Sequence, residues 1–470
     1  MDFDLSETIG IDFGTSYSTV SKYENGKVVM VMDEFYNDCI PTYISYKNND
    51  FICGHQAFLS ACSNTENTVY EIKRLIGHSY GDEVISKCIK QMPYKIVDDS
   101  KGGVQIEIED GEKKHHFSIQ FLISRFISFL IKKAELSLSH PVKNCVITVP
   151  SYFSTKQKNI IVNAVKETGI RVLSYLTEPT AAALAYSINN NYIGKTKTIV
   201  VYDFGGGTFD VSIIQGSPGS FDVLATSGDT EVGGRDITAI VSEYLQEELK
   251  KYPNYSNYCT SKIGLEYIRN TAEKMKEELT LNLSTETFIN NGDDGIKITL
   301  GRDEFEKRIT SLVQRTIDVV QECIQFVKMN PENIDYIILI GGSSYIPLIK
   351  RMLANTFPSS KILDTIDTRL AVATGALHLA SILKQGNFLH ENSSNTVVLK
   401  NPGESFSVAS LLKKQADEKT VVVNGETLTL QPPIMPPDYE VSCAPYDSAV
   451  ALIEETVNKY PRTFYMVSLH

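Results

Sequence analysis

The chain has 470 residues and a net charge of −12, with 42% hydrophobic and 22% charged residues. These values are typical of a soluble globular protein that is long enough for about two to four domains. The acidic balance argues against nucleic-acid binding, which needs a basic face, and no stretch is long and apolar enough to predict a membrane span.

The eight cysteines form no C-x-x-C pair and no Cys/His metal spacing. We interpret them as small core residues in a reducing compartment, the cytoplasm with the nucleus as the alternative. The acidic residues 1–7 lack the basic region of a secretory signal.

The first predicted pair of strands lies in Ile9-Gly-Ile-Asp-Phe-Gly-Thr-Ser-Tyr-Ser-Thr-Val20. An apolar strand ends at Asp12, Gly14 forms the turn, and a second strand follows the hydroxyl residues. Residues 37–116 are then expected to form an inserted subdomain with strands at 42–46 and 104–109. Within it, 68–77 predicts a short helix, and from this stretch alone Lys73 is interpreted as an ordinary solvated lysine.

Alternating helices and strands follow. We expect helices at 117–138 and 156–168, and strands at 145–149 and 171–175. A further helix begins at Glu178-Pro179, because proline suits the first turn and an acid suits the positive end of the helix dipole. Glu178 therefore stands beyond the carboxyl end of a strand, where ligands bind in open α/β sheets.

A second glycine turn separates the predicted strands 198–202 and 209–214. Asp203 ends the first of these strands, and Gly205, Gly206 and Gly207 leave backbone N–H groups open to an anion. Asp203 beside them suits a divalent cation held through water. A tight turn with a merely solvated acid is the alternative.

The same Asp-Phe-Gly sequence occurs at 12–14 and at 203–205. This repetition predicts a duplication into two similar α/β halves. Two such turns facing each other would hold one polyphosphate between them, and we favour this phosphate-binding role.

The second half is predicted to carry a helical, charged insertion at about 232–308, with an amphipathic helix at 262–279. A buried strand at 334–340 ends in Gly341-Gly342 and is followed by helices at 346–354 and 370–383. In the tail, 420–430 predicts a hairpin with a type I′ turn at Asn424-Gly425. Residues 439–444 and 464–469 are strand-like, and 449–460 predicts a helix.

Several of these stretches together carry a family resemblance. They are the first hairpin, Thr148-Val-Pro-Ser-Tyr-Phe153, Glu178-Pro-Thr-Ala-Ala-Ala183, Asp203-Phe-Gly-Gly-Gly-Thr-Phe-Asp210, Gly228-Asp-Thr-Glu-Val-Gly-Gly234 and Gly341-Gly-Ser343. In this order they resemble the seventy-kilodalton heat-shock chaperones of the DnaK type over about residues 7–385.

The resemblance implies an α/β fold of the actin-like ATPase type, with two lobes of two subdomains each and a small C-terminal α/β or β-rich segment. Lobe I is expected at 1–191 with 366–385, including an insertion at about 42–116. Lobe II is expected at 192–365, including the insertion at about 232–308. Residues 386–470 would be a divergent C-terminal region, without the usual linker and lid.

The resemblance also implies ATP or ADP, Mg²⁺ and K⁺ as ligands in the central cleft. Asp12, Glu178 and Asp203 would surround Mg²⁺ mostly through water, and Asp210 would help to hold the ions. Lys73 and Thr208 would reach the γ-phosphate, which reverses the solvated interpretation of Lys73. The other implied nucleotide contacts are Gly14, Thr15, Ser16, Tyr17, Gly205, Gly206, Gly207, Gly233, Gly234, Glu273, Lys276, Thr280, Gly341, Gly342, Ser343, Tyr345 and Arg369.

Three positions depart from the family pattern. Glu277 and Tyr345 replace two arginines that lie against the adenine, and Arg369 stands where an acid near the ribose is common. An aromatic ring can still stack on a base. The hydrolytic groups are all present, so a competent ATPase is expected.

The leading interpretation is a protein-folding chaperone that binds Mg-ATP and hydrolyses it slowly. Its partners would be a J-domain co-chaperone, a nucleotide-exchange factor or unfolded clients. The alternative is a non-hydrolysing, ATP-bound regulator or exchange partner of a full-length chaperone. A small-molecule kinase of the same fold is a third, less favoured interpretation.

Overall fold

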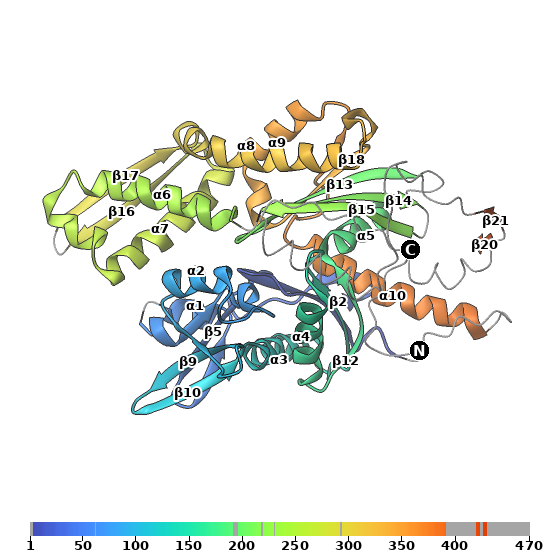
Figure 1. The fold of residues 1–470 in the computed structure, drawn as a ribbon, viewed down its shortest axis with the longest axis horizontal. Coiled ribbons are helices and arrows are strands. Elements are labelled where there is room, and N and C mark those ends of the chain that lie inside the picture. The colour runs from blue at the N-terminus through green and yellow to red at the C-terminus, as the bar shows by residue number, and fades with distance from the viewer. Residues whose placement is uncertain are drawn as a thin grey trace.

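The structure is a computed structural model that describes residues 3–391, except 62, 191–195, 218–219, 230 and 292–293, together with residues 420–423 and 426–429. Figure 1 shows two sheet-containing halves, each with a further group of elements at its outer end. In the described residues no helix combines the length and the apolar character that a bilayer span requires.

The first half is built on the sheet β12-β11-β1-β2-β3, with β4 paired to β2. The central strand β1 runs parallel to β11 and antiparallel to β2. All six residues of β11 are buried, as expected for a continuous apolar run inside a sheet covered on both faces. The bounds are β1 Thr8–Asp12, β2 Tyr17–Glu24, β3 Lys27–Met30, β4 Ile40–Pro41, β11 Asn144–Val149 and β12 Arg171–Thr177.

The second half repeats this plan in the sheet β15-β14-β13-β18-β19. Its central strand β13 runs parallel to β18 and antiparallel to β14, as β1 does with β11 and β2. The predicted duplication is therefore confirmed at the level of topology. The bounds are β13 Lys197–Phe204, β14 Phe209–Ser217, β15 Ser220–Asp229, β18 Tyr336–Ile340 and β19 Lys361–Leu363.

The insertion in the first half contains two small three-stranded sheets, β6-β5-β7 and β10-β9-β8. The prediction of one helix over 68–77 is wrong in its first part. Residues Thr68–Tyr70 pair with β5 as strand β7, and only Ile72–Leu75 form a helical turn, η2. The other bounds are β5 Tyr43–Lys47, β6 Asp50–Cys53, α1 His55–Ser60, η1 Thr65–Asn67, α2 Glu83–Gln91, β8 Lys95–Asp98, β9 Val104–Asp110 and β10 Lys113–Ser118.

The sequence predicted a helical insertion in the second half, but the structure also contains strands there. The antiparallel hairpin β16–β17 lies against α7, because the apolar side of each strand needs a partner surface. The bounds are α6 Gly234–Leu249, η3 Pro253–Cys259, α7 Lys262–Leu281, β16 Ser284–Asn291 and β17 Asp294–Gly301.

Helices α5 and α10 cross between the two large sheets (Figure 1) and share one core with both of them. The crossing is close, because a Cβ atom at Gly375 would lie 1.8 Å from the carbonyl oxygen of Ala181. The two halves are therefore joined through a tightly packed helix pair. The remaining bounds are α3 Ile119–Leu138, α4 Thr155–Lys166, α5 Glu178–Asn190, α8 Arg302–Phe326, η4 Pro331–Asn333, η5 Gly342–Tyr345, α9 Pro347–Thr356 and α10 Ala371–Glu391.

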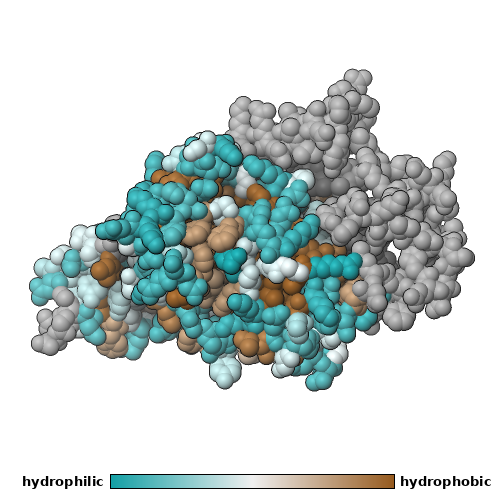
Figure 2. Space-filling view, turned by 90° about the horizontal axis from the view of Figure 1, so that it is seen from below, coloured by the Kyte–Doolittle hydropathy of each residue, from teal (hydrophilic) through white to brown (hydrophobic). Residues whose placement is uncertain are grey.

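The tail hairpin is confirmed as strands β20 Thr420–Val423 and β21 Glu426–Thr429. Its turn at 424–425, and the elements predicted at 439–444, 449–460 and 464–469, lie outside the described residues. On the face drawn in Figure 2, polar residues dominate the described surface, with small groups of apolar residues between them.

Candidate functional site

The two glycine turns, one from each half of the molecule, lie close together and face each other. A Cβ atom placed on Gly206 would lie 2.1 Å from Oγ of Ser16, and one placed on Gly207 would lie 3.1 Å from Cγ2 of Thr15. Only glycine allows the second turn to approach the first this closely. The arrangement expected from the repeated Asp-Phe-Gly sequence is thus present.

The first turn is tightly built. The N–H of Gly14 donates to Oγ of Ser18 over 3.2 Å, and the carbonyl oxygen of Gly14 accepts from Oγ1 of Thr42 over 3.0 Å. Tyr17 begins β2 beside this turn, and 41% of its surface is exposed. Part of this residue therefore remains exposed beside the first turn.

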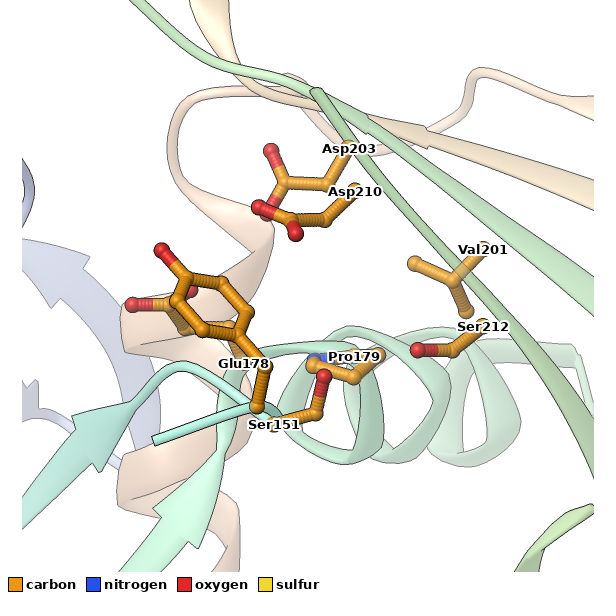
Figure 3. A pocket seen from close by; sticks show the side chains of 8 residues that line it. Ser151, Glu178, Pro179, Val201, Asp203, Asp210 and Ser212 are labelled. Carbon is orange, nitrogen blue, oxygen red and sulfur yellow. The ribbon is translucent and has the colours of Figure 1, made fainter. Parts of the chain in front are cut away.

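Carboxylates come together beside the turns because each ends or begins an element of a central sheet. Asp12 ends β1 and accepts from Oγ1 of Thr148 over 2.9 Å. Asp203 and Asp210 are register partners on β13 and β14, and Oγ1 of Thr208 donates to Asp210 over 3.1 Å. Figure 3 shows the carboxylates of Asp203 and Asp210 side by side, with Glu178 across the same pocket.

Lys73 points into this cluster from the first insertion. Its ammonium group donates to Oε1 of Glu178 over 2.6 Å, and only 7% of the residue is exposed. The interpretation of Lys73 as a solvated lysine is therefore wrong. The helical turn η2 carries the side chain inward, a placement that the local sequence alone did not reveal.

Burial and mutual repulsion perturb the acids. Burial raises the pKa of Asp12 to about 7, and the charge of Glu178 adds to the effect while Lys73 opposes it. Burial and Glu178 likewise raise the pKa of Asp210 to about 7, and the pKa of Asp203 is raised by the same causes. Burial would lower the pKa of Lys73, but the charges of Glu178 and Asp12 outweigh this and raise it.

The donor set fits a divalent cation held through water. Four carboxylates, those of Asp12, Glu178, Asp203 and Asp210, face one lysine, and their oxygens are the ligands that a hard cation prefers. Among the described residues, no three His, Cys, Asp or Glu side chains form a direct metal-ligand group. Contact through water is what the resemblance implies for these acids.

Ion pairs that the sequence patterns did not reveal cross between the halves near the second turn. Arg74, next to Lys73, donates to the carbonyl oxygen of Gly207. Glu71 forms an ion pair with Arg74, whose Nε lies 2.9 Å away, and accepts a hydrogen bond from Nη1 of Arg235 on α6 over 2.6 Å. Glu71 and Arg74 flank Lys73 in the sequence, and this proximity could have indicated that they lie near the site. Nothing in the sequence around Arg235 indicated that it pairs with Glu71.

The start of α6 packs on the second turn. The N–H of Gly234 donates to the carbonyl oxygen of Gly205 over 3.0 Å, and a Cβ on Gly233 would lie 2.5 Å from the carbonyl carbon of Gly207. Lys276 of α7 bonds Glu273 at 2.7 Å and the carbonyl oxygen of Gly234 at 3.3 Å. Hydrogen bonds thus link the second turn, the start of α6 and the side chains of Lys276 and Glu273 on α7.

The predicted contacts from the end of β18 lie beside the same turn. Gly341 has φ +83°, which favours glycine, and Gly342 and Ser343 follow in η5. Oγ of Ser343 donates to the carbonyl oxygen of Gly205 over 2.9 Å. The backbone path through Gly341 thus brings η5 against the second turn.

The three remaining predicted contacts are Tyr345, Arg369 and Thr280. Tyr345 ends η5, and the Arg369 guanidinium carbon lies 5.7 Å from the centre of its ring. The hydroxyl of Thr280 donates to the carbonyl oxygen of Glu277 on its own helix over 2.7 Å. The structure therefore ties Tyr345 to Arg369, and gives Thr280 a local partner.

Hydroxyl groups that the sequence analysis missed line the floor of the carboxylate pocket. Oγ1 of Thr226 bonds Ser151 Oγ at 3.0 Å and Ser212 Oγ at 2.8 Å. Ser151 and Ser212 line the pocket with Glu178, Asp203 and Asp210 (Figure 3). Ser151 belongs to the motif Thr148–Phe153, which could have pointed to it. Ser212 lies within the predicted strand 209–214, where nothing in the sequence marked it as a pocket residue.

Comparison with known proteins gives the family. A family model described as Hsp70 protein matches residues 8–403. The chain is 31% identical over 395 residues to a heat shock cognate HSP70 protein of Trypanosoma brucei brucei, covering 83% of this chain and 58% of that protein. It is 33% identical over 396 residues to a ribosome-associated molecular chaperone of Zygosaccharomyces rouxii, covering 83% of this chain and 64% of that protein.

A heat shock protein of Pyricularia oryzae is 32% identical over 377 residues, which cover 80% of this chain and 61% of that protein. The chain thus spans about three-fifths of the length of these curated relatives. The family match, the duplicated sheets and the facing glycine turns agree. This chain belongs to the Hsp70 family and has its mixed α/β, actin-like ATPase fold.

Proposed function

We propose that this chain binds Mg-ATP between its two glycine turns and slowly hydrolyses it to ADP and phosphate. The observation that carries the proposal is the convergence of Lys73, Glu178, Asp203 and Asp210 beside two closely facing glycine turns. Members of the Hsp70 family are ATPases, which agrees with this chemistry. The lobe boundaries at 1–191 with 366–385 and at 192–365 belong to the same proposal.

Each group has a part in the reaction. Phosphoryl transfer to water needs in-line placement and charge stabilisation more than covalent help. The ammonium group of Lys73, held by Glu178, supports the γ-phosphate and orients the attacking water. Thr208 and the amides of Gly206 and Gly207 bind the phosphate oxygens, whereas the N–H of Gly205, which the sequence predicted to be open, donates to the carbonyl oxygen of Thr208 over 3.1 Å. Bound Mg²⁺, with K⁺ as a further ion, would neutralise charge on the phosphates from the side of Asp12, Asp203 and Asp210.

The proposal extends to protein folding. The family and its chaperone relatives support a chaperone that works with a J-domain co-chaperone, a nucleotide-exchange factor or unfolded clients. The chain spans about three-fifths of the length of its relatives. Chaperone activity is therefore proposed, and tested, separately from ATP hydrolysis. A cytoplasmic or nuclear site of action is part of the proposal.

Phosphate release from the purified full chain tests the enzymatic part. We expect slow release that requires Mg²⁺ and is lost in Lys73→Ala. Mg²⁺-dependent ATP binding without any turnover would instead indicate an ATP-bound regulatory protein.

The chaperone part needs a separate assay. The ATPase rate is measured with and without an unfolded peptide, for the full chain and for a chain ending at residue 385. Peptide stimulation that requires residues 386–470 supports a client-binding tail. Equal rates in all four samples would contradict it.

A further inference from the structure

A buried hydroxyl group beside the proposed cation site has no hydrogen-bond partner in the described part of the chain. Thr19 lies on β2 and is only 2% exposed. No donor or acceptor among the described residues bonds its Oγ1 atom. Buried hydroxyl groups are nearly always hydrogen-bonded, because an unpaired one loses its bonds to water and gains none. The place of Thr19 in the sheet indicates which group can supply the missing bond.

Thr19 is the register partner of Asp12. The two residues are directly opposite each other in the antiparallel pair of β1 and β2. Residues opposed in this way point to the same face of a sheet, with Cβ atoms about 5 Å apart. Strand β2 therefore places the side chain of Thr19 next to that of Asp12.

Helix α10 covers this face of the sheet. Two residues before Asp12, a Cβ atom on Gly10 would lie 2.7 Å from the carbonyl oxygen of Ala373 on α10. Oγ of Ser21, two residues after Thr19, donates to the same carbonyl oxygen over 2.7 Å. Because side chains alternate along a strand, Asp12 and Thr19 are on the covered face as well. Thr19 is buried there, whereas Asp12, at the end of β1, is only partly buried.

A second threonine flanks Asp12 from the other neighbouring strand. Strand β11 runs parallel to β1 with Ile147 beside Ile11, so Thr148 follows beside Asp12. Oγ1 of Thr148 donates to Oδ1 of Asp12 over 2.9 Å. Within the residues that the structure describes, Oδ2 of Asp12 accepts no hydrogen bond. Asp12 thus lies between two threonines, and only the hydroxyl group of Thr148 is paired with it.

We infer that Thr19 is a positioning residue of the proposed cation site, which supplies a second hydrogen bond to the Asp12 carboxylate, directly or through one water of the bound cation. This inference rests on the proposed function. An ionised carboxylate accepts at both of its oxygens, so Asp12 can take one hydrogen bond from each neighbouring strand. Such outer hydrogen bonds orient the groups that hold a metal and strengthen its binding. Rotation about the Cα–Cβ bond of Thr19 moves its hydroxyl group between staggered positions without any change in the backbone.

Thr19→Val, which removes the hydroxyl group and nearly keeps the shape, should affect the free and the bound chain differently. The nucleotide-free variant loses an unpaired hydroxyl group, so its denaturant midpoint of unfolding should stay the same or rise. Calorimetry with the Mg²⁺ complex of a non-hydrolysable ATP analogue should show about three- to tenfold weaker binding, because one hydrogen bond is lost. Binding of the same analogue in EDTA should not change. Thr19→Ser keeps the hydroxyl group and should bind the Mg²⁺ complex nearly as tightly as the wild-type chain.

Thr8→Val on the neighbouring strand is the matched control. Thr8 begins β1, is fully buried and donates to the carbonyl oxygen of Asp4 over 2.5 Å. Its replacement should lower the stability of the nucleotide-free chain, because an existing hydrogen bond is lost. The ratio of the affinities with and without Mg²⁺ should not change, since Thr8 and Asp12 are at opposite ends of β1.

Three results would each overturn the inference and leave the proposed ATPase intact. They are an affinity ratio with and without Mg²⁺ that Thr19→Val does not change, an equal loss of affinity in Thr19→Ser, and a nucleotide-free Thr19→Val chain that is unfolded or less stable than wild type. A wild-type chain that binds no nucleotide, or binds it equally well in EDTA, would overturn the proposed function and this inference with it.

Discussion

The ammonium group of Lys73 lies 2.6 Å from Oε1 of Glu178, although the two residues are 105 positions apart in the chain. This pair joins the first insertion to the start of α5 inside the carboxylate cluster. Lys73 offsets the charge of Glu178, whereas burial and mutual repulsion raise the pKa values of Asp12, Asp203 and Asp210. A cation bound beside these acids would favour their ionised form.

Lys73→Ala should abolish phosphate release and largely preserve nucleotide affinity. The lysine acts on charge that develops during the reaction, and losing one such donor costs about 100-fold or more in rate. Single-turnover phosphate release and ATP titration measure the two effects. Lys90→Ala, an exposed lysine on α2, is the control and should keep the wild-type rate. Unchanged turnover in Lys73→Ala would remove the lysine from the mechanism.

The nucleotide-free protein should lose stability as the pH rises through the acid cluster. The pKa values of Asp12 and Asp210 are raised from 3.8 to about 7 in the folded state, so the folded state binds more protons than the unfolded state between these values. Stability therefore falls as pH rises from about 4 and levels off above about 7.

The variant Asp210→Asn tests whether stability falls with rising pH because Asp210 loses its proton. In chelator and without nucleotide, the gain in the free energy of unfolding should be about 1–2 kcal/mol larger at pH 8 than at pH 5.5. Denaturant titrations at both pH values give the measurement. A gain that is equal at the two pH values would show that Asp210 does not titrate in this range.

Gly206→Ala should weaken ATP binding by about tenfold or more, because the new methyl group would meet Ser16 at a distance that real contacts never show. The two turns would have to move apart to relieve it. Gly81→Ala is a matched control, since nothing lies within 4 Å of the Cβ position there. Equal nucleotide affinity in both variants would mean that the close approach of the turns is dispensable.

The ion pair between Glu71 and Arg235 should slow nucleotide release, because it joins the two halves beside the second turn. Glu71→Gln and Arg235→Gln should each raise the ADP dissociation rate. Their double-mutant cycle should show a coupling of about 1 kcal/mol, since both side chains are largely buried. Stopped-flow release of a fluorescent ADP analogue measures the rates.

The exposed pair of Lys297 and Glu286 on the β16–β17 hairpin provides the comparison. Its cycle should show a coupling near zero, because exposed pairs contribute little. Additive effects at Glu71 and Arg235 would indicate that the pair does not hold the halves together.

The sequence by itself determined the duplicated core. Apolar runs that end in Asp-Phe-Gly are local patterns, and the strands β1, β2, β13 and β14 follow from them with small shifts at their ends. Family motifs added the nucleotide site, including the role of Lys73 that local sequence had hidden. The hairpin β16–β17 was missed because a polar, two-stranded ribbon acquires its structure from α7, a neighbour that local patterns do not reveal.

Only the tertiary structure decided which side chains meet. Periodicity describes one element at a time, but the charge around Glu71 depends on Arg235, which belongs to the other half of the molecule. The same holds for Tyr345 and Arg369, which the sequence presented as separate departures and the fold places 5.7 Å apart, from the guanidinium carbon to the ring centre. Local order follows from residue spacing, whereas electrostatic and stacking partners follow from how the two sheets pack around α5 and α10.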